Sequence, residues 1–105
     1  MVTLINQFAV TGDVDEFQQV LDEFRDFMAG QPGALSYRLV RSLRRPEVFV
    51  EFADWTDVDS HRTAVNSDGF RALIKRLAPL VEKPTPDLYV TVREHVNGSE
   101  SVGAP

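Results

Sequence analysis

The sequence predicts an α+β domain with a four-stranded antiparallel sheet and helices on one of its faces. Two observations lead to this prediction. Four short runs alternate apolar and polar residues, and the stretches between them repeat apolar residues every three or four positions. The order is strand, helix, strand, strand, helix, strand. The strands are expected at residues 2–10, 34–43, 48–55 and 86–96, and the helical segments at 14–29, 57–66 and 70–81.

The first strand carries polar side chains on both of its faces. Leu4, Asn6 and Phe8 share one face, and Gln7 lies on the other. Each side of this strand is therefore expected to meet something other than a purely apolar core. The helix that follows begins after an Asp13 cap. Its apolar stripe consists of Phe17, Val20, Leu21, Phe24 and Met28.

The second and third strands are expected to form a hairpin, because only the turn at residues 44–47 separates them. Leu35, Tyr37 and Leu39 are predicted to share one face of the second strand. This face is more apolar than the opposite one, so we expect it to contribute to the core.

The third strand and the helix after it place unusual residues close together. Phe49, Glu51 and Trp55 lie on the same face of the strand. A carboxylate in the middle of a strand, between apolar residues, is not typical of a core strand. The next helix, capped at Asp57, is expected to carry His61 back over the end of the strand.

The whole succession is that of a ferredoxin-like domain, expected at residues 1–96 with a disordered tail at 97–105. The sheet face without helices carries Ile5 or Leu4 and alternate residues of the hairpin, which would leave an apolar patch in water. Face-to-face packing of two sheets buries such a patch, so we predict a symmetric homodimer.

The composition argues against several classes of function. The net charge of -5 over 105 residues disfavours nucleic acid as the main partner. No run approaches the ~20 apolar residues of a membrane span, and the N-terminus lacks the features of a signal peptide, so we expect a cytoplasmic protein with no membrane partner. With no cysteines and two widely separated histidines, the sequence predicts no metal site.

Four segments stand out along the chain: a first strand with Asn6, then QPGALSYRLVRS, FVEFADWTDVDSHRTAVNSDGF and PDLYVTV. Together they resemble the antibiotic biosynthesis monooxygenase family over residues 2–95. The resemblance implies a dimeric α+β barrel. Members of this family include cofactor-independent oxygenases that oxidise anthrone-type or hydroquinone-type aromatic polyketides to quinones. The resemblance therefore implies a reaction with O₂ as co-substrate and with neither metal nor flavin.

The resemblance also implies roles for individual residues. A strand Asn and the Trp contact substrate oxygens in such enzymes, and Asn6 and Trp55 occupy the matching positions. Glu51 stands where these oxygenases often have Asn, and His61 stands where some have Tyr. These two departures favour acid-base chemistry more strongly than the family pattern does.

Glu51 and His61 are interpreted as the groups that move protons. Glu51, with a pKa raised by apolar surroundings, would remove a phenolic or benzylic proton. The alternative is a Glu that faces solvent or pairs with Arg38 or Arg41. His61 would pass the proton on or donate a hydrogen bond to the substrate, and the alternative is a surface histidine.

Trp55 and Asn6 are interpreted as residues that hold the substrate. The indole would stack on a flat ring and offer its N–H, although it also suits a core anchor. The Asn6 amide would stabilise an oxyanion, or else make a cross-strand hydrogen bond. Further candidates for substrate contacts are Tyr37, Phe17, Phe24, Phe49 and a basic residue of the last helix, Lys75 or Arg76.

Three functions fit these residues. The first is a cofactor-independent oxygenase that converts an aromatic polyketide to a quinone. The second is a polyketide cyclase or isomerase that uses the same Glu and His without oxygen. The third is a non-catalytic module that binds a small molecule.

Overall fold

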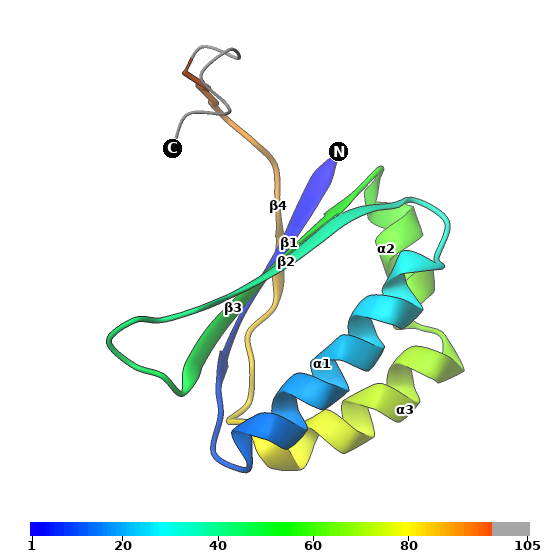
Figure 1. The fold of residues 1–105 in the computed structure, drawn as a ribbon. Coiled ribbons are helices and arrows are strands. Elements are labelled where there is room, and N and C mark those ends of the chain that lie inside the picture. Colours follow the sequence, from blue (N-terminus) through cyan, green and yellow to red (C-terminus); the bar gives the residue numbers. More distant parts are fainter. Residues whose placement is uncertain (98–105) are drawn as a thin grey trace.

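A four-stranded antiparallel sheet with helices on one face forms the structure, as the sequence predicts (Figure 1). It is a computed structural model that describes residues 1–97. The strand order is β2-β3-β1-β4, which is the ferredoxin-like arrangement. The elements are β1 Val2–Ala9, α1 Val14–Ala29, β2 Ala34–Arg41, β3 Val48–Trp55, α2 Val58–Val65, α3 Asp68–Leu77, the 3-10 turn η1 Ala78–Leu80 and β4 Asp87–Tyr89.

The register of the central strands brings the two polar residues of the helix-facing side together. Asn6 of β1 lies directly opposite Glu51 of β3, and Leu39 of β2 lies on the other side of Glu51. Directly opposed residues project to the same face of a sheet. Asn6 and Glu51 therefore both point toward the helices.

Side-chain caps set where the two short helices begin. The Asp57 carboxylate accepts a hydrogen bond from the backbone N–H of Ser60 at 2.7 Å. The Ser67 hydroxyl accepts one from the N–H of Phe70 at 3.3 Å. Each cap satisfies a backbone donor that the first turn of a helix leaves unpaired. The predicted interruption at residues 67–69 is therefore the start of a new helix.

Two groups of buried apolar side chains fill the space between the sheet and the helices. The larger contains Phe8, Val10, Phe17, Val20, Leu21, Phe24, Phe49, Leu73, Leu77, Leu80 and Val81. The smaller contains Val2, Leu4, Ala53, Trp55 and Ala64. Both groups contribute to the walls of a cavity that lies under the helices.

The structure departs from the predicted strands at two places. The register of β2 against β3 shifts between Ala34 and Ser36, so Leu35 does not share the buried face of Tyr37 and is exposed. The last strand ends at Tyr89 and not at residue 96. Of the tail predicted at 97–105, residues 98–105 lie outside the described part of the chain.

Candidate active site

A cavity of about 280 Å³ lies between the sheet and the helices. Its walls are almost entirely apolar, and its polar side chains are those of Asn6, Tyr37, Glu51, Trp55 and His61. A mostly apolar pocket with a few convergent polar groups is typical of small-molecule sites. The remaining lining residues are Leu4, Phe8, Leu21, Phe24, Met28, Ala53, Val65, Phe70, Ile74, Leu77, Pro84 and Pro86.

Glu51 is the central polar group of this cavity. Its Oε2 accepts a hydrogen bond from the Tyr37 hydroxyl at 3.1 Å, and its Oε1 accepts a weaker one from the Asn6 amide nitrogen at 3.5 Å. Burial raises the pKa of Glu51, while the hydrogen bonds from Tyr37 and Asn6 oppose that rise. The carboxylate is therefore a stronger base than an exposed Glu. Its position is fixed by hydrogen bonds from side chains of two neighbouring strands, β1 and β2.

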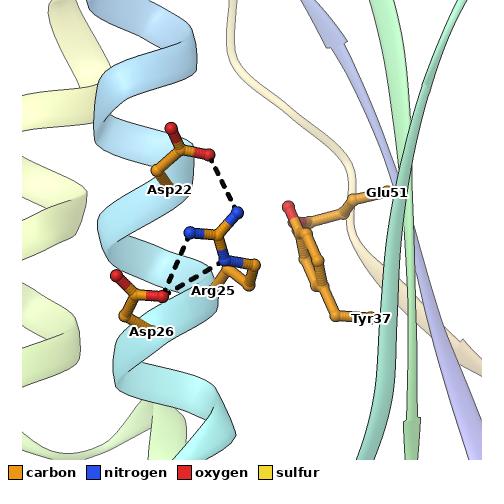
Figure 2. Close-up of polar contacts among 5 residues, drawn as sticks. All are labelled: Asp22, Arg25, Asp26, Tyr37 and Glu51. Atoms are coloured by element: carbon orange, nitrogen blue, oxygen red, sulfur yellow. Dashed lines mark hydrogen bonds and ion pairs between the residues drawn. The ribbon is translucent and has the colours of Figure 1, made fainter.

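Tyr37 lies between this carboxylate and α1. Figure 2 shows Arg25 on the side of α1 that faces Tyr37 and Glu51. Arg25 is paired with Asp22 at 3.3 Å and with Asp26 at 3.2 Å, so its charge is balanced on its own helix. Burial and the nearby Glu51 raise the pKa of Tyr37 far above its usual value. Tyr37 therefore stays a neutral hydrogen-bond donor.

A smaller pocket of about 150 Å³ adjoins the cavity. The two share a wall made of Met28, Tyr37, Ala53 and Trp55. Arg25 contributes to the smaller pocket and not to the larger one. Tyr37 therefore separates the ion-paired surface of α1 from the apolar interior that contains Glu51.

Trp55 and His61 form another wall of the cavity. Trp55 is 1% exposed, and its ring meets the His61 ring edge-to-face with centroids 5.5 Å apart. Burial lowers the pKa of His61, so its imidazole is neutral at pH 7. Among residues 1–97, no hydrogen bond joins His61 to Glu51.

The position of His61 depends on a close approach of the chain at Gly33. Gly33 has φ +89°, and a Cβ there would lie 2.5 Å from the Ser60 side chain. Its carbonyl also accepts a hydrogen bond from the Thr56 N–H at 2.9 Å. Only glycine tolerates both the positive φ and the lack of space for a Cβ. The close contact with Ser60 places the first turn of α2 beside the start of β2.

Two buried polar atoms of the site lack a hydrogen-bond partner within the described part of the chain. They are the Asn6 Oδ1 acceptor and the Trp55 Nε1 donor. Buried polar atoms in native proteins are nearly always paired. A ligand that offers one acceptor and one donor would therefore relieve two unfavourable burials.

Most predicted site residues meet in this cavity, but four do not. Phe17 is fully buried and packs between Phe8 and Phe49, with ring centroids 5.4 and 4.9 Å away. Neither Phe17 nor Phe49 lines the cavity, because both belong to the larger group of core side chains. Lys75 is exposed on α3 and does not reach the cavity. Arg76 pairs with Glu23 at the surface at 2.6 Å.

The sequence reasoning missed several residues of the walls. Phe70 and Ile74 come from α3, of which the sequence predicts only Lys75 or Arg76 as a substrate contact. Pro84 and Pro86 come from the connection before β4, and Met28 comes from the end of α1. The signal available in the sequence was the spacing of apolar residues along this helix at Phe70, Leu73, Ile74 and Leu77.

Within residues 1–97, no group of three or more His, Asp or Glu side chains gathers as metal ligands. None of the helices there has both the length and the apolar character that crossing a bilayer requires.

The fold and this cavity define a small α+β domain with a carboxylate buried in an apolar pocket. The family model for antibiotic biosynthesis monooxygenases matches residues 1–76. The chain therefore belongs to the antibiotic biosynthesis monooxygenase family, as the segments quoted above indicate.

Two named relatives come from Streptomyces nogalater. Deoxynogalonate monooxygenase is 38% identical over 69 residues, which are 66% of this chain and 58% of that protein. The crystal structure of SnoaB, described as a cofactor-independent oxygenase, is 32% identical. It superposes with a TM-score of 0.85 over 92% of this chain and 97% of its own.

More distant structures share the fold alone. One is described as a putative antibiotic biosynthesis monooxygenase from Deinococcus radiodurans, at 20% identity and a TM-score of 0.77. It covers 92% of this chain and 97% of its own.

Proposed function

We propose that this protein is a cofactor-independent oxygenase that converts an anthrone-type or hydroquinone-type aromatic polyketide to a quinone with O₂. The observation that carries the proposal is the Glu51 carboxylate, which is buried in an apolar cavity that is also lined by Asn6 and Trp55, whose buried polar atoms lack a partner in the described chain. The similarity to a deoxynogalonate monooxygenase and to a cofactor-independent oxygenase supports the same class of reaction.

Glu51 is the base in this proposal. For an anthrone, it removes a proton from the ring CH₂, and the negative charge spreads over the ring system and its oxygen. A base with a raised pKa is suited to this transfer near neutral pH. The Tyr37 hydroxyl, 3.1 Å from the carboxylate, keeps the base oriented toward the cavity.

The oxygen chemistry then balances without a cofactor. The substrate anion gives one electron to O₂, and the two radicals combine to form a peroxide anion at the former CH₂. This anion takes the proton from Glu51 and becomes a hydroperoxide. Loss of water from this intermediate gives the carbonyl, so CH₂ and O₂ become C=O and H₂O. In this step Glu51 removes the second proton of the former CH₂ and passes it to the departing hydroxide.

Asn6 and Trp55 hold the anion. The Trp55 Nε1–H is a buried donor without a partner in the described chain, and it suits the oxygen on which negative charge gathers. The Asn6 Oδ1 is a buried acceptor for a substrate hydroxyl. His61, neutral and partly exposed, provides a route for protons between the cavity and solvent.

We also propose that the protein acts as a homodimer that packs its sheets face to face. The register places Ile5 beside Phe52, Gln7 beside Val50 and Thr3 beside Tyr89 on the face that no helix covers. The Arg38 guanidinium lies 4.9 Å from the centre of the Phe52 ring. An apolar strip with polar margins of this kind is typical of an interface.

The decisive test is O₂ uptake by metal-free and flavin-free protein with a panel of hydroxylated anthrones and hydroquinones. We expect one O₂ consumed for each anthrone converted and a quinone absorbance that rises with it. The same reaction without oxygen separates the alternatives, because a cyclase or isomerase would still change the substrate. No turnover of any panel member would contradict the proposal.

A further inference from the structure

No step of the proposed reaction uses the smaller pocket between the end of α1 and the start of β2. It encloses about 150 Å³, and four of the side chains that line it also line the larger cavity: Met28, Tyr37, Ala53 and Trp55. Because each of these side chains borders both spaces, the wall between the pocket and the cavity is a single layer of side chains.

The volumes of the two spaces limit the ring systems that they can hold. A cavity of roughly 150 Å³ is large enough to bind benzene. The smaller pocket therefore has room for one aromatic ring. In proportion to the number of carbons, two fused rings need roughly 250 Å³ and three need roughly 350 Å³. The larger cavity, at about 280 Å³, therefore encloses two fused rings but not three.

Of the four shared side chains, Met28 is the one that can rotate out of the wall. Tyr37 is held by its hydrogen bond to the buried carboxylate, Trp55 is 1% exposed, and Ala53 has no side-chain torsion to change. Methionine is unbranched and adapts its shape to what it packs against. Met28 is half-buried in the last turn of α1, so a change of rotamer there joins the two spaces.

The smaller pocket also differs from the cavity in its access to water. Arg25, Ala29 and Leu35 line it and are exposed. Figure 2 shows that two carboxylates of α1 pair with the Arg25 guanidinium, which leaves no positive charge in excess on this side. A ring in this pocket would bury its carbons while its hydroxyl or carbonyl oxygens stay close to water.

We propose that the smaller pocket is a second subsite, which takes the outer, oxygen-bearing ring of a substrate with three fused rings when Met28 rotates away. This inference rests on the proposed function and extends it by placing the rings. The reacting ring and its neighbour lie in the cavity with Glu51, and the outer ring passes the position of Met28. Met28 touches none of the reacting atoms and determines specificity, because it sets the length of ring system that fits.

Binding in the absence of oxygen tests the subsite independently of turnover. The probes are naphthohydroquinone, which has two fused rings, and dithranol, a dihydroxylated anthrone with three. Trp55 is the only tryptophan and borders both spaces, so quenching of its fluorescence reports binding. We expect a Kd at least about tenfold lower for dithranol, because the third ring adds four carbons and burial of one CH₂ group alone is a factor of about four.

Ala29→Phe fills the smaller pocket and leaves the cavity as it is, since Ala29 lines only the pocket. We expect the Kd of dithranol to rise at least about tenfold and that of naphthohydroquinone to stay within about twofold. Ala72→Phe is the matched control, because Ala72 is also exposed on a helix and lines neither space. It should leave both Kd values within about twofold, and circular dichroism checks that both variants fold.

A second pair of variants tests the movement of Met28. Met28→Ile places a side chain of similar size in the wall, and a β-branched residue in a helix keeps one preferred rotamer. We expect it to weaken dithranol about tenfold and naphthohydroquinone by less than about twofold. Met28→Ala opens the wall and should bind dithranol at least as tightly as wild type. Equal losses for both probes in both variants would show that Met28 only packs against the ligand.

The outcomes separate the subsite from the oxygenase. If Ala29→Phe keeps the wild-type Kd for dithranol, the third ring lies elsewhere and the subsite is wrong, while O₂ uptake still decides the oxygenase. Dithranol binding that Ala29→Phe weakens selectively, without O₂ uptake by any panel member, would support the subsite and overturn the oxygenase. Failure of wild type to bind either probe would overturn the subsite.

Discussion

Two carboxylates on the same strand, Glu51 and Asp54, show how the faces of the sheet differ. Both lie on β3, three residues apart, so they point to opposite sides. Glu51 faces the cavity, where Tyr37 and Asn6 bond it and burial raises its pKa. Asp54 lies on the open face and accepts hydrogen bonds from two hydroxyl groups, one of them that of Ser36 at 2.9 Å.

The difference between them is in their surroundings. Asp54 sits among hydroxyl groups near water, and its contacts join neighbouring strands. Glu51 sits among apolar side chains, where ionisation is unfavourable and a proton is held more tightly. On the helix-covered face the Glu51 carboxylate therefore becomes a stronger base, whereas on the open face the Asp54 carboxylate connects neighbouring strands through hydrogen bonds.

The largest effect is expected for Glu51→Gln, which keeps the shape of the side chain and removes the base. We expect kcat with an anthrone to fall at least about 100-fold, the contribution that a positioned general base commonly makes. Steady-state O₂ uptake measures it. Activity within tenfold of wild type would show that another group removes the proton.

The same variant should also change how the stability of the protein depends on pH. The folded chain holds the Glu51 proton more tightly than the unfolded chain, where the pKa is 4.5. The stability that this group contributes is therefore complete below 4.5 and is lost as pH rises through the higher pKa of the folded state. Glu51→Gln should abolish this loss, so its Tm should rise relative to that of wild type as pH increases from 4.5 through the pKa of the folded state, and the difference should be constant above it.

Tyr37→Phe should have the next largest effect. Its hydroxyl opposes the rise in the pKa of Glu51, so its removal raises that pKa further. The acid limb of the profile of kcat against pH should move up by about one unit, since a hydrogen bond to a charged group contributes about 1.5 kcal/mol. Recovery of kcat at high pH would identify Tyr37 as a positioning residue, whereas a uniform loss would not.

His61→Gln tests the proton route and should lower kcat by about fivefold, less than loss of the base itself. Because burial lowers the pKa of His61, the unfolded chain takes up a proton below 6.5 more readily than the folded chain does. Wild type should therefore lose stability as pH falls below 6.5, and His61→Gln should lose less. Thermal melts from pH 5 to 7.5 measure this dependence of Tm on pH. It has the opposite sign to the dependence that Glu51 causes, because the contribution of Glu51 is lost as pH rises.

Asp54→Asn is the matched control and should have the smallest effect. It removes a charge from β3 on the face away from the cavity, and kcat should stay within about twofold of wild type, as expected for a change away from a site. The free energy of unfolding should fall by about 1 kcal/mol, because one of the hydrogen bonds to the hydroxyl groups is weakened. A large loss of kcat would show that the two faces are not independent.

Much of the fold was predictable because its signals are local. Residues 14–29 are predicted as a helix and form α1 with the same bounds, since the apolar stripe, the Asp13 cap and Gly30 all lie within that stretch. The alternation of β1 and β3 likewise predicts which side chains share a face of each strand. Glu51 was conspicuous because it contradicts that alternation, and it is the residue at the centre of the cavity.

The predictions that were wrong concern properties that depend on contacts between different helices and strands. Phe17, Phe24 and Phe49 are alike in the sequence, but only Phe24 reaches the cavity, because Phe17 and Phe49 pack against each other. The fourth strand was expected to continue to residue 96, since its pattern does, yet a strand also needs a neighbour.

The amino-acid sequence by itself determined the order of the elements, the residues that share a face of β1 and of β3, and the family to which the chain belongs. These depend on spacing and on short-range hydrogen bonds, which are properties of neighbouring residues. Only the tertiary structure decided that Asn6, Tyr37, Glu51, Trp55 and His61 surround one cavity. Strand register and the packing of helices set these distances, and both join residues far apart in the chain.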